Sequence, residues 1–322
     1  MNAVLAALAL ALDRILGDPD AVWRRVPHPV AGFGALIAAA ERRGNQAHWP
    51  ARRRRAAGTV SILALLGLAA LLGHGLHRLL APLGWPGLGV EALVASVFLA
   101  QRSLADHVGR VAGALDREGL AAGRRAVSMI VGRDPEALDE AGVARAAIES
   151  LAENASDGVV APWLFLLVFG LPGLLAYKML NTADSMIGHL DDRYRDYGWA
   201  AARLDDVANL VPARLTAGLL VLAAVLTSGR GAGVRAARAA WADGRRHRSP
   251  NAGWPEAAAA GALALALGGP RRYGTLAVEA PLLHAAGRRV ATAADIRAAL
   301  RLFRRVCDLL LALTLVALAF TG

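Results

Sequence analysis

The chain has 322 residues, of which 56% are hydrophobic, and its mean hydropathy is +0.40. Its formal net charge is +10, but the arginines flank apolar runs and do not alternate with aromatic side chains. This arrangement differs from a base-stacking surface, so nucleic acid is not an expected partner. Apolar runs separated by basic loops are instead typical of an integral membrane protein.

The chain shows no internal boundary. Neither a linker nor a repeat divides it, so we expect one domain covering residues 1–322. A single cysteine, Cys307, excludes an intramolecular disulfide. Because Asp13 and Arg14 interrupt the first apolar run and no small-residue cleavage site follows it, no removable signal peptide is expected.

The first half of the chain predicts helices at 1–16, 30–40, 57–80 and 88–100. Four arginines, 52–55, precede the third of these runs and should lie in the cytoplasm. The runs 57–80 and 88–100 then form a membrane hairpin, with Trp85 in the loop at the far interface. Residues 101–158 return to the cytoplasm as two or three amphipathic helices.

The run 159–180 allows two topologies. Its 22 residues can cross a bilayer once, because about 20 suffice. However, Gly170-Leu171-Pro172-Gly173 divides it into two pieces that are each too short. We favour a segment that dips into the membrane and returns, which is tolerated where protein buries the broken backbone. This re-entrant topology keeps the polar motifs before and after the run on one face.

Apolar runs at 207–228 and 306–320 complete the predicted fold. We expect an all-α, polytopic helical bundle in the inner (cytoplasmic) membrane of the cell, with amphipathic cytoplasmic helices and re-entrant segments. Arg214, near the start of the first run, is costly in lipid unless it is paired. It either pairs with Asp205 or Asp206, or extends to the interface.

Acidic side chains are concentrated between residues 149 and 206. In a helix, Glu149, Glu153 and Asp157 would share one face at i, i+4 and i+8, a spacing at which like charges repel. A divalent cation or an arginine cluster would remove this repulsion and form a site. Polar oxygens at i+3 or i+4 recur in two later groups. One is Asn181 with Asp184 and Ser185, and the other is Asp205 and Asp206 with Asn209.

Two further features suggest anion binding. The chain has 35 arginines and one lysine, Lys178, whose compact charge suits a phosphate or a developing anion; chance survival is the alternative. Residues 255–267 are expected to form a short helix, with Arg248, Ser249, Asn251 and Gly253 before it. Its N-terminus can hold a phosphate, although an ordinary capped helix is also consistent with the sequence.

Several motifs resemble one family. They are ESLAENASDG (149–158), NTADSMIG (181–188), DDVAN (205–209) and SPNAGWPEAAAAGAL (249–263), with GDP (17–19) and HPV (28–30). Together they resemble the membrane-bound adenosylcobinamide(-phosphate) synthase family of cobalamin biosynthesis (CobD/CbiB), over nearly the whole chain. The resemblance implies an enzyme that joins adenosylcobyric acid to aminopropanol, or to its O-phosphate, through an amide bond.

The resemblance also implies ATP as co-substrate, Mg²⁺, an active site facing the cytoplasm, and other late cobalamin-assembly membrane enzymes as partners in the lipid bilayer. Catalytic roles are then expected for Glu153, Asp157, Lys178, Asp184 and Asp205. Metal ligands are expected among Glu149, Glu153, Asp157, Asp184, Asp205 and Asp206. Substrate or phosphate contacts are expected from His28, Asn154, Asn181, Ser185, Asn209, Arg214, Arg248, Ser249, Asn251, Gly253 and Glu256.

Two other functions remain open. A magnesium-dependent intramembrane prenyltransferase requires N-x-x-x-D-x-x-x-D, and Asn181 and Asp184 are one residue too close for it. A non-enzymatic membrane sensor or regulator on the same scaffold would not need the full set of acidic motifs.

Overall fold

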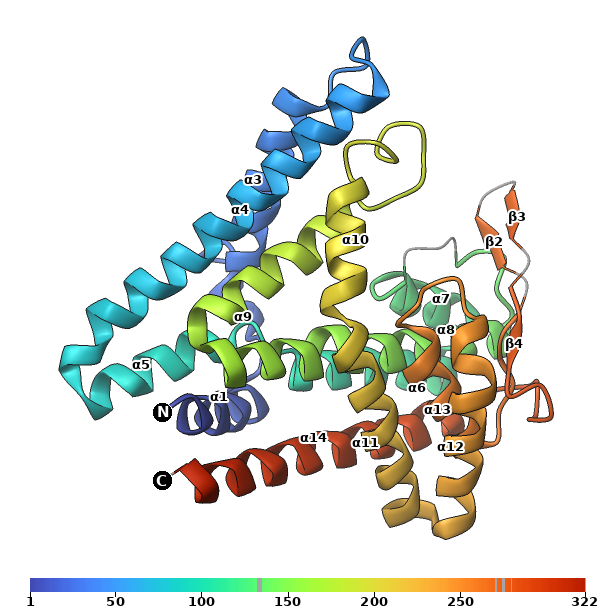
Figure 1. The fold of residues 1–322 in the computed structure, drawn as a ribbon. Coiled ribbons are helices and arrows are strands. Elements are labelled where there is room, and N and C mark those ends of the chain that lie inside the picture. Colours follow the sequence, from blue (N-terminus) through green and yellow to red (C-terminus); the bar gives the residue numbers. More distant parts are fainter. Residues whose placement is uncertain (132–134, 270, 274–275, 279, 322) are drawn as a thin grey trace. The chain divides into compact units, whose positions relative to one another are not determined.

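A computed structural model describes residues 1–131, 135–269, 271–273, 276–278 and 280–321 (Figure 1). They are helical almost throughout, which confirms the all-α prediction. Among these residues, four helical stretches are long and apolar enough to cross a membrane: Ala51–Leu83, Trp85–Glu118, Glu140–Ile187 and Leu210–Ser228.

The chain forms two compact units. The first contains residues 1–100, 161–209 and 314–322, and the second contains 101–160 and 210–313. Each unit is therefore assembled from segments distant in sequence, and the chain passes between the units four times. The single domain expected from the sequence remains a prediction.

The first unit is built from long helices. They are α1 (Asn2–Leu16), α2 (Asp20–Trp23), α3 (Pro29–Gly44), α4 (Ala51–Leu80), η1 (Ala81–Leu83), α5 (Trp85–Ser96), α9 (Ala161–Ile187) and α10 (Trp199–Ala208). Arginines 52–55 form the first turn of α4 itself, because the helix starts before the apolar run. Trp85 begins α5 and does not lie in the loop where the sequence placed it, because Gly84, at φ 62°, already completes the turn.

Glycines on α4 allow close packing in this unit. A Cβ atom at Gly73 would lie 2.7 Å from the Cα of Pro172, and one at Gly58 would lie 1.8 Å from the carbonyl oxygen of Tyr197. No larger residue fits at these two positions without backbone movement. Small residues have this role in membrane bundles, where lipid offers no hydrophobic drive for helix association.

Helix α9 is bent sharply at Gly170, whose φ of 66° and ψ of −160° are not helical. The rings of Phe165 and Tyr177 stack with their centroids 4.8 Å apart. In a straight helix, 12 residues would separate them by about 18 Å at 1.5 Å per residue. The chain therefore folds back on itself, as Figure 1 shows for the yellow-green α9. A re-entrant segment requires this geometry, but its membrane topology remains a prediction.

The second unit contains α6 (Gln101–Glu118), α7 (Leu120–Ser128), α8 (Glu140–Asn154), the π-helical turn η2 (Ala155–Val160), α11 (Leu210–Ser228), α12 (Arg230–Asp243), η3 (Gly244–Arg246), α13 (Gly253–Leu263) and most of α14 (Ala293–Thr321). Two short antiparallel pairs accompany them. Strand β1 (Leu267–Gly268) pairs with β4 (Leu282–Leu283), and β2 (Arg271–Tyr273) pairs with β3 (Leu276–Val278).

The predicted helix 255–267 was wrong at both ends. Helix α13 begins at Gly253 and ends at Leu263, where Ala264 takes the left-handed conformation with φ 53°. The residues expected to form its last turn instead lead into β1, where Leu267 pairs with Leu283. Long-range strand pairing thus replaces the last helical turn.

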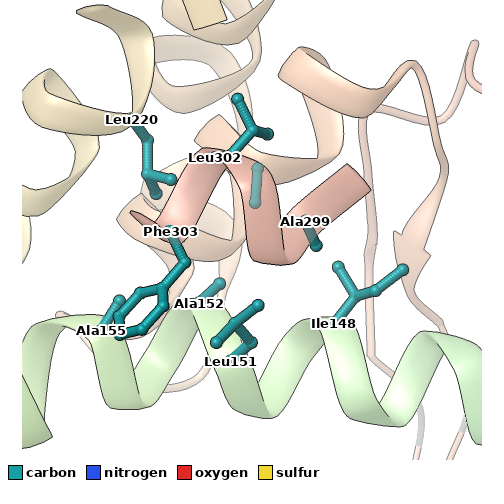
Figure 2. A pocket seen from close by; sticks show the side chains of 9 residues that line it. Ile148, Leu151, Ala152, Ala155, Leu220, Ala299, Leu302 and Phe303 are labelled. Atoms are coloured by element: carbon teal, nitrogen blue, oxygen red, sulfur yellow. The ribbon is translucent and has the colours of Figure 1, made fainter. Parts of the chain in front are cut away.

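A small apolar cavity lies inside the second unit (Figure 2). Its lining is Ile148, Leu151, Ala152, Ala155, Leu220, Ala259, Ala299, Leu302 and Phe303. The cavity measures about 10 Å³, room for about one water molecule. It is too small and too apolar to hold a substrate.

Candidate functional site

A buried hydrogen-bonded chain joins α9 to the end of α10. The Tyr177 hydroxyl donates to Asn209 Oδ1 at 2.9 Å, and Asn209 Nδ2 donates to Asp205 Oδ2, also at 2.9 Å. Tyr177 and Asn209 are each 1% exposed, and Asp205 is 8% exposed. The phenol therefore orients the amide, and the amide orients one oxygen of the carboxylate.

The other oxygen of Asp205 is unusual. Oδ1 is buried and accepts no hydrogen bond from any residue that the structure describes. Burial raises the pKa of Asp205 to about 7; negative charge on Asp184 and Asp206 adds to the effect, and the amides of Asn209 and Asn181 oppose it. Burial also raises the pKa of Asp206, against the influence of Arg203. Three carboxylates thus crowd a site where a cation would relieve their repulsion.

The C-terminal arm of α9 carries Lys178, Asn181, Asp184 and Ser185, of which Asn181 and Asp184 act on Asp205. Ser185 Oγ donates to the carbonyl oxygen of Asn181 at 2.9 Å. Gly188 directly follows the arm, and only glycine fits there without movement, because a Cβ would lie 2.1 Å from Asp184 Oδ1. The structure therefore brings together Asn181, Asp184, Asp205, Asp206 and Asn209, and their roles in metal or substrate binding remain predictions.

His28 links the two N-terminal motifs. Its Nδ1 accepts a hydrogen bond from the backbone N–H of Val30 at 3.2 Å, which caps α3. Its Nε2 lies 3.6 Å from Asp18 Oδ1, and its ring makes an edge contact with Trp23 at 4.5 Å. The role predicted for His28 in substrate binding stays a prediction.

In the second unit, the carboxylates of 149–157 differ in their surroundings. Glu149 is 5% exposed, and its Oε1 accepts a hydrogen bond from the Gly268 N–H at 2.8 Å. Glu153 is exposed, and Asp157 lies in the π-helical turn η2. A π-turn closes at i+5, so the α-helical i, i+4, i+8 register expected for these residues does not extend to Asp157. Neighbouring Asn154 donates to the Ser150 carbonyl oxygen at 2.9 Å.

The described residues contain no group of three His, Cys, Asp or Glu side chains placed to hold a metal ion. The predicted metal ligands come from both units: Glu149, Glu153 and Asp157 from the second, and Asp184, Asp205 and Asp206 from the first. The complete metal set therefore remains a prediction.

The turn before α13 is held by its own side chains. Ser249 Oγ accepts from the backbone N–H groups of Asn251 and Ala252, each at 3.2 Å. His247 Nδ1 accepts from the Ser249 N–H at 3.1 Å, and its Nε2 lies 3.9 Å from Glu256 Oε1. Because two of the N–H groups are already used, a phosphate here would depend mainly on side-chain cations such as the exposed Arg248.

Arg214 is anchored beside this turn. Its Nη1 donates to Asn251 Oδ1 at 2.9 Å, and its guanidinium lies 4.9 Å from the centre of the Trp254 ring. An amide and an aromatic face thus stabilise an arginine inside an apolar helix. Gly253 allows the tight turn, because a Cβ there would lie 2.3 Å from the Gly244 carbonyl oxygen.

Sequence reasoning missed Tyr177, His247 and Trp254. Tyr177 precedes Lys178 directly, and the other two lie inside or beside a motif already noted, so their positions gave a signal. Their contacts could not be predicted from the sequence, because the partners are distant in it: Tyr177 and Asn209 are 32 residues apart.

The fold and the clustered carboxylates define the class of the chain: it is a polytopic, all-α membrane protein with a buried acidic site. A family model described as "CobD/Cbib protein" matches residues 6–303. The chain therefore belongs to the CobD/CbiB family and has a role in cobalamin biosynthesis.

Individual relatives agree with this assignment. Cobalamin biosynthesis protein CobD of a Sinorhizobium species is 56% identical over 307 residues, which cover 95% of each chain. The protein of the same name from Brucella anthropi is 55% identical, over 98% of this chain and 96% of the relative. That from Rhodobacter capsulatus is 49% identical, over 88% and 87%. No solved structure matches the chain.

Proposed function

We propose that the chain is an ATP-dependent, amide-forming ligase of the adenosylcobinamide-phosphate synthase type. It joins (adenosyl)cobyric acid to aminopropanol or to its O-phosphate and forms (adenosyl)cobinamide or its phosphate. Family membership supports the pathway. The observation that carries the chemistry is the buried Asp205, beside Asp184 and Asp206: Asn209 orients one of its oxygens, and the other accepts no hydrogen bond from the residues that the structure describes.

This donor set fits Mg²⁺. Magnesium takes oxygen ligands, usually one or two carboxylates together with substrate phosphates. Asp205, with either Asp184 or Asp206 as a second carboxylate, would hold it in the first unit, where the raised pKa of Asp205 reflects burial and repulsion that a bound cation would offset. The ion would neutralise negative charge on the phosphates of ATP.

The chemistry needs activation because a carboxylate is a poor electrophile. The cobyric acid carboxylate attacks the γ-phosphorus of ATP, so a C–O–P bond forms and ADP leaves. The amine nitrogen then attacks the acyl carbon, the C–N bond forms, inorganic phosphate leaves, and the amine loses a proton. In the first unit, Lys178 would hold anionic groups, and Asn181, Ser185 and Asn209 would orient polar ones.

The site would face the cytoplasm, where ATP is available. The arginines 52–55 precede the apolar part of α4, and the positive-inside tendency favours the cytoplasm for that end of the helix. The sensor alternative predicts corrinoid binding without turnover, so one assay separates the two functions.

The test is turnover by the purified protein in detergent. Adenosylcobyric acid, either amine, ATP and magnesium should give the amide product with stoichiometric nucleotide hydrolysis, and EDTA should stop the reaction. Asp184→Asn and Asp205→Asn should abolish turnover, whereas Asp106→Asn, at a carboxylate that is 64% exposed, should not. Product formation at the same rate without nucleotide would show that the ligase mechanism is wrong. Absence of product with both amines would favour the sensor.

A further inference from the structure

A basic pocket lies in the first unit where the end of α3, the start of α4 and the loop 188–198 meet. Its lining is Glu41, Arg42, Asn45, Gln46, Ala47, Arg54, Asp192, Arg193 and Arg195. Its volume of about 810 Å³ falls within the usual range of small-molecule sites, about 300–1,000 Å³. We call it the arginine pocket. None of its residues belongs to the candidate ligase site.

The walls of the arginine pocket are held in place by hydrogen bonds. Asp191 Oδ1 accepts from the backbone N–H groups of Arg193 and Tyr194, at 3.0 and 2.8 Å. Asn45 Nδ2 donates to the Arg193 carbonyl oxygen at 2.9 Å, which ties the loop to the end of α3. Tyr197, a residue of this loop, is only 1% exposed, and its ring lies against Gly44 at the end of α3. These hydrogen bonds hold the loop in one conformation without a ligand.

Two of the four lining arginines are neutralised inside the protein. Arg193 forms a fork on the buried Glu41, with Nε–Oε1 at 3.1 Å and Nη2–Oε2 at 3.0 Å. Burial alone would raise the pKa of Glu41, but hydrogen bonds from Arg193 and Asn45 outweigh it, and the pKa lies below its usual value. Arg54 pairs with Asp196 at 2.8 Å. These pairs build the pocket and leave little net charge.

The excess positive charge of the pocket comes from Arg42, because Arg195, like Arg193 and Arg54, faces a carboxylate. The Arg42 guanidinium makes no ion pair with any residue that the structure describes, although its charge contributes to the lowered pKa of Glu41. Arg195 lies 3.4 Å from Asp192, whose side chain is 98% exposed, and such surface pairs contribute little. The guanidinium fork matches the oxygens of a phosphate and binds them in a bidentate manner.

We propose that the arginine pocket binds a phosphate-bearing anion, either a soluble phosphate compound or the headgroup of an anionic lipid. Both sources present the same oxygens to Arg42 and Arg195. The proposal does not depend on the ligase reaction, because binding is measured without corrinoid or amine.

The test compares two neighbouring arginines on α3. Arg42 lines the pocket, whereas Arg43 has the same charge but does not line it and donates to the Ala39 carbonyl oxygen. The purified full-length protein is titrated with inorganic phosphate and with ATP by calorimetry. In a second arm, nanodiscs of phosphatidylcholine with spin-labelled phosphatidylglycerol report lipid bound at the protein surface.

Losing one charge-assisted hydrogen bond should weaken binding about tenfold. We expect this loss for Arg42→Ala and for Arg195→Ala, on the opposite wall, with Arg43→Ala within about twofold of the wild type. If the loss occurs with ATP or phosphate, the ligand is soluble; if it occurs only with phosphatidylglycerol, the ligand is lipid. Equal losses for Arg42→Ala and Arg43→Ala, or no binding of any probe to the wild type, would overturn the proposal. Unchanged elution from a sizing column shows that each variant is folded.

Discussion

At the scale of single residues, Asp205 combines burial with a carboxylate oxygen that accepts no hydrogen bond from the described part of the chain. Its folded pKa of about 7 lies above the ordinary value of 3.8. The folded protein therefore keeps a proton that the unfolded chain releases between these two values. By linkage, the stability contributed by this group is present below about pH 4 and is lost as the pH rises to about 7.

Asp205→Asn should remove this pH dependence. In EDTA, the wild type should lose more thermal stability than the variant between pH 5 and pH 8. Over this pH range the difference is at most roughly 3 kcal/mol, because about two of the units that separate the two pKa values fall inside it, at 1.36 kcal/mol per pKa unit. Thermal unfolding in detergent, followed by tryptophan fluorescence, measures it. Parallel pH profiles for the two proteins would show that Asp205 does not titrate in this range.

Tyr177 should orient the site without taking part in the reaction. Tyr177→Phe deletes the donor to Asn209 Oδ1 and leaves a buried acceptor unsatisfied, which costs about 1–3 kcal/mol. We expect a lower melting temperature and a reduced rate at saturating substrate. Tyr194→Phe, at a half-exposed tyrosine of the 188–198 loop, is the matched control and should have little effect on either measurement.

The sequence pointed to the residues of the acidic cluster but not to its internal geometry, and the roles of these residues remain predictions. Polar side chains repeated at helical spacing are unusual in an apolar chain, and they indicated a cluster at Asn181, Asp184, Asp205, Asp206 and Asn209. The role of each oxygen depends on tertiary contacts. Glu149 could not be separated from Glu153 by type or spacing, yet its contact with Gly268, 119 residues away, buries it.

At the scale of elements, apolar runs predicted which helices exist, and tertiary packing decided where they end. The run 57–80 became the 30-residue α4, because the arginines before it are good helix formers. Helix α13 stops four residues early because strand pairing takes over its predicted last turn. Gly170-Leu171-Pro172-Gly173 was identified as a break, and the structure bends α9 at its first glycine.

The bend of α9 predicts that two glycine-to-alanine substitutions change the stability of the protein in opposite directions. Gly170→Ala places a side chain at φ 66° and ψ −160°, a conformation that costs an L-residue about 1–3 kcal/mol. Gly67→Ala lies within α4, where a Cβ meets nothing within 4 Å, and should stabilise the helix by up to about 1 kcal/mol. Melting temperatures in detergent should therefore fall for the first variant and rise for the second. Equal shifts would mean that the bend carries no strain.

At the scale of the whole molecule, the fold-back of α9 predicts a topology that can be tested. If residues 159–180 dip into the membrane and return, Glu153 and Ser185, both exposed, lie on the cytoplasmic face. In a Cys307→Ser background, Glu153→Cys and Ser185→Cys should both react with an impermeant maleimide in inside-out vesicles. Neither should react in right-side-out vesicles. Labelling from opposite sides would establish a single crossing.

The near absence of lysine makes the predicted active site chemically addressable. Apart from the amino terminus, Lys178 carries the one primary amine of the chain, and it lies on the arm of α9 that also carries Asn181 and Asp184. An amine-reactive ester thus has a single side-chain target in the unmodified protein. Mass spectrometry measures how much of Lys178 reacts with and without each substrate. A substrate that lowers the reaction binds over this arm of α9. An arginine-rich chain of this kind can be footprinted at one position without any mutation.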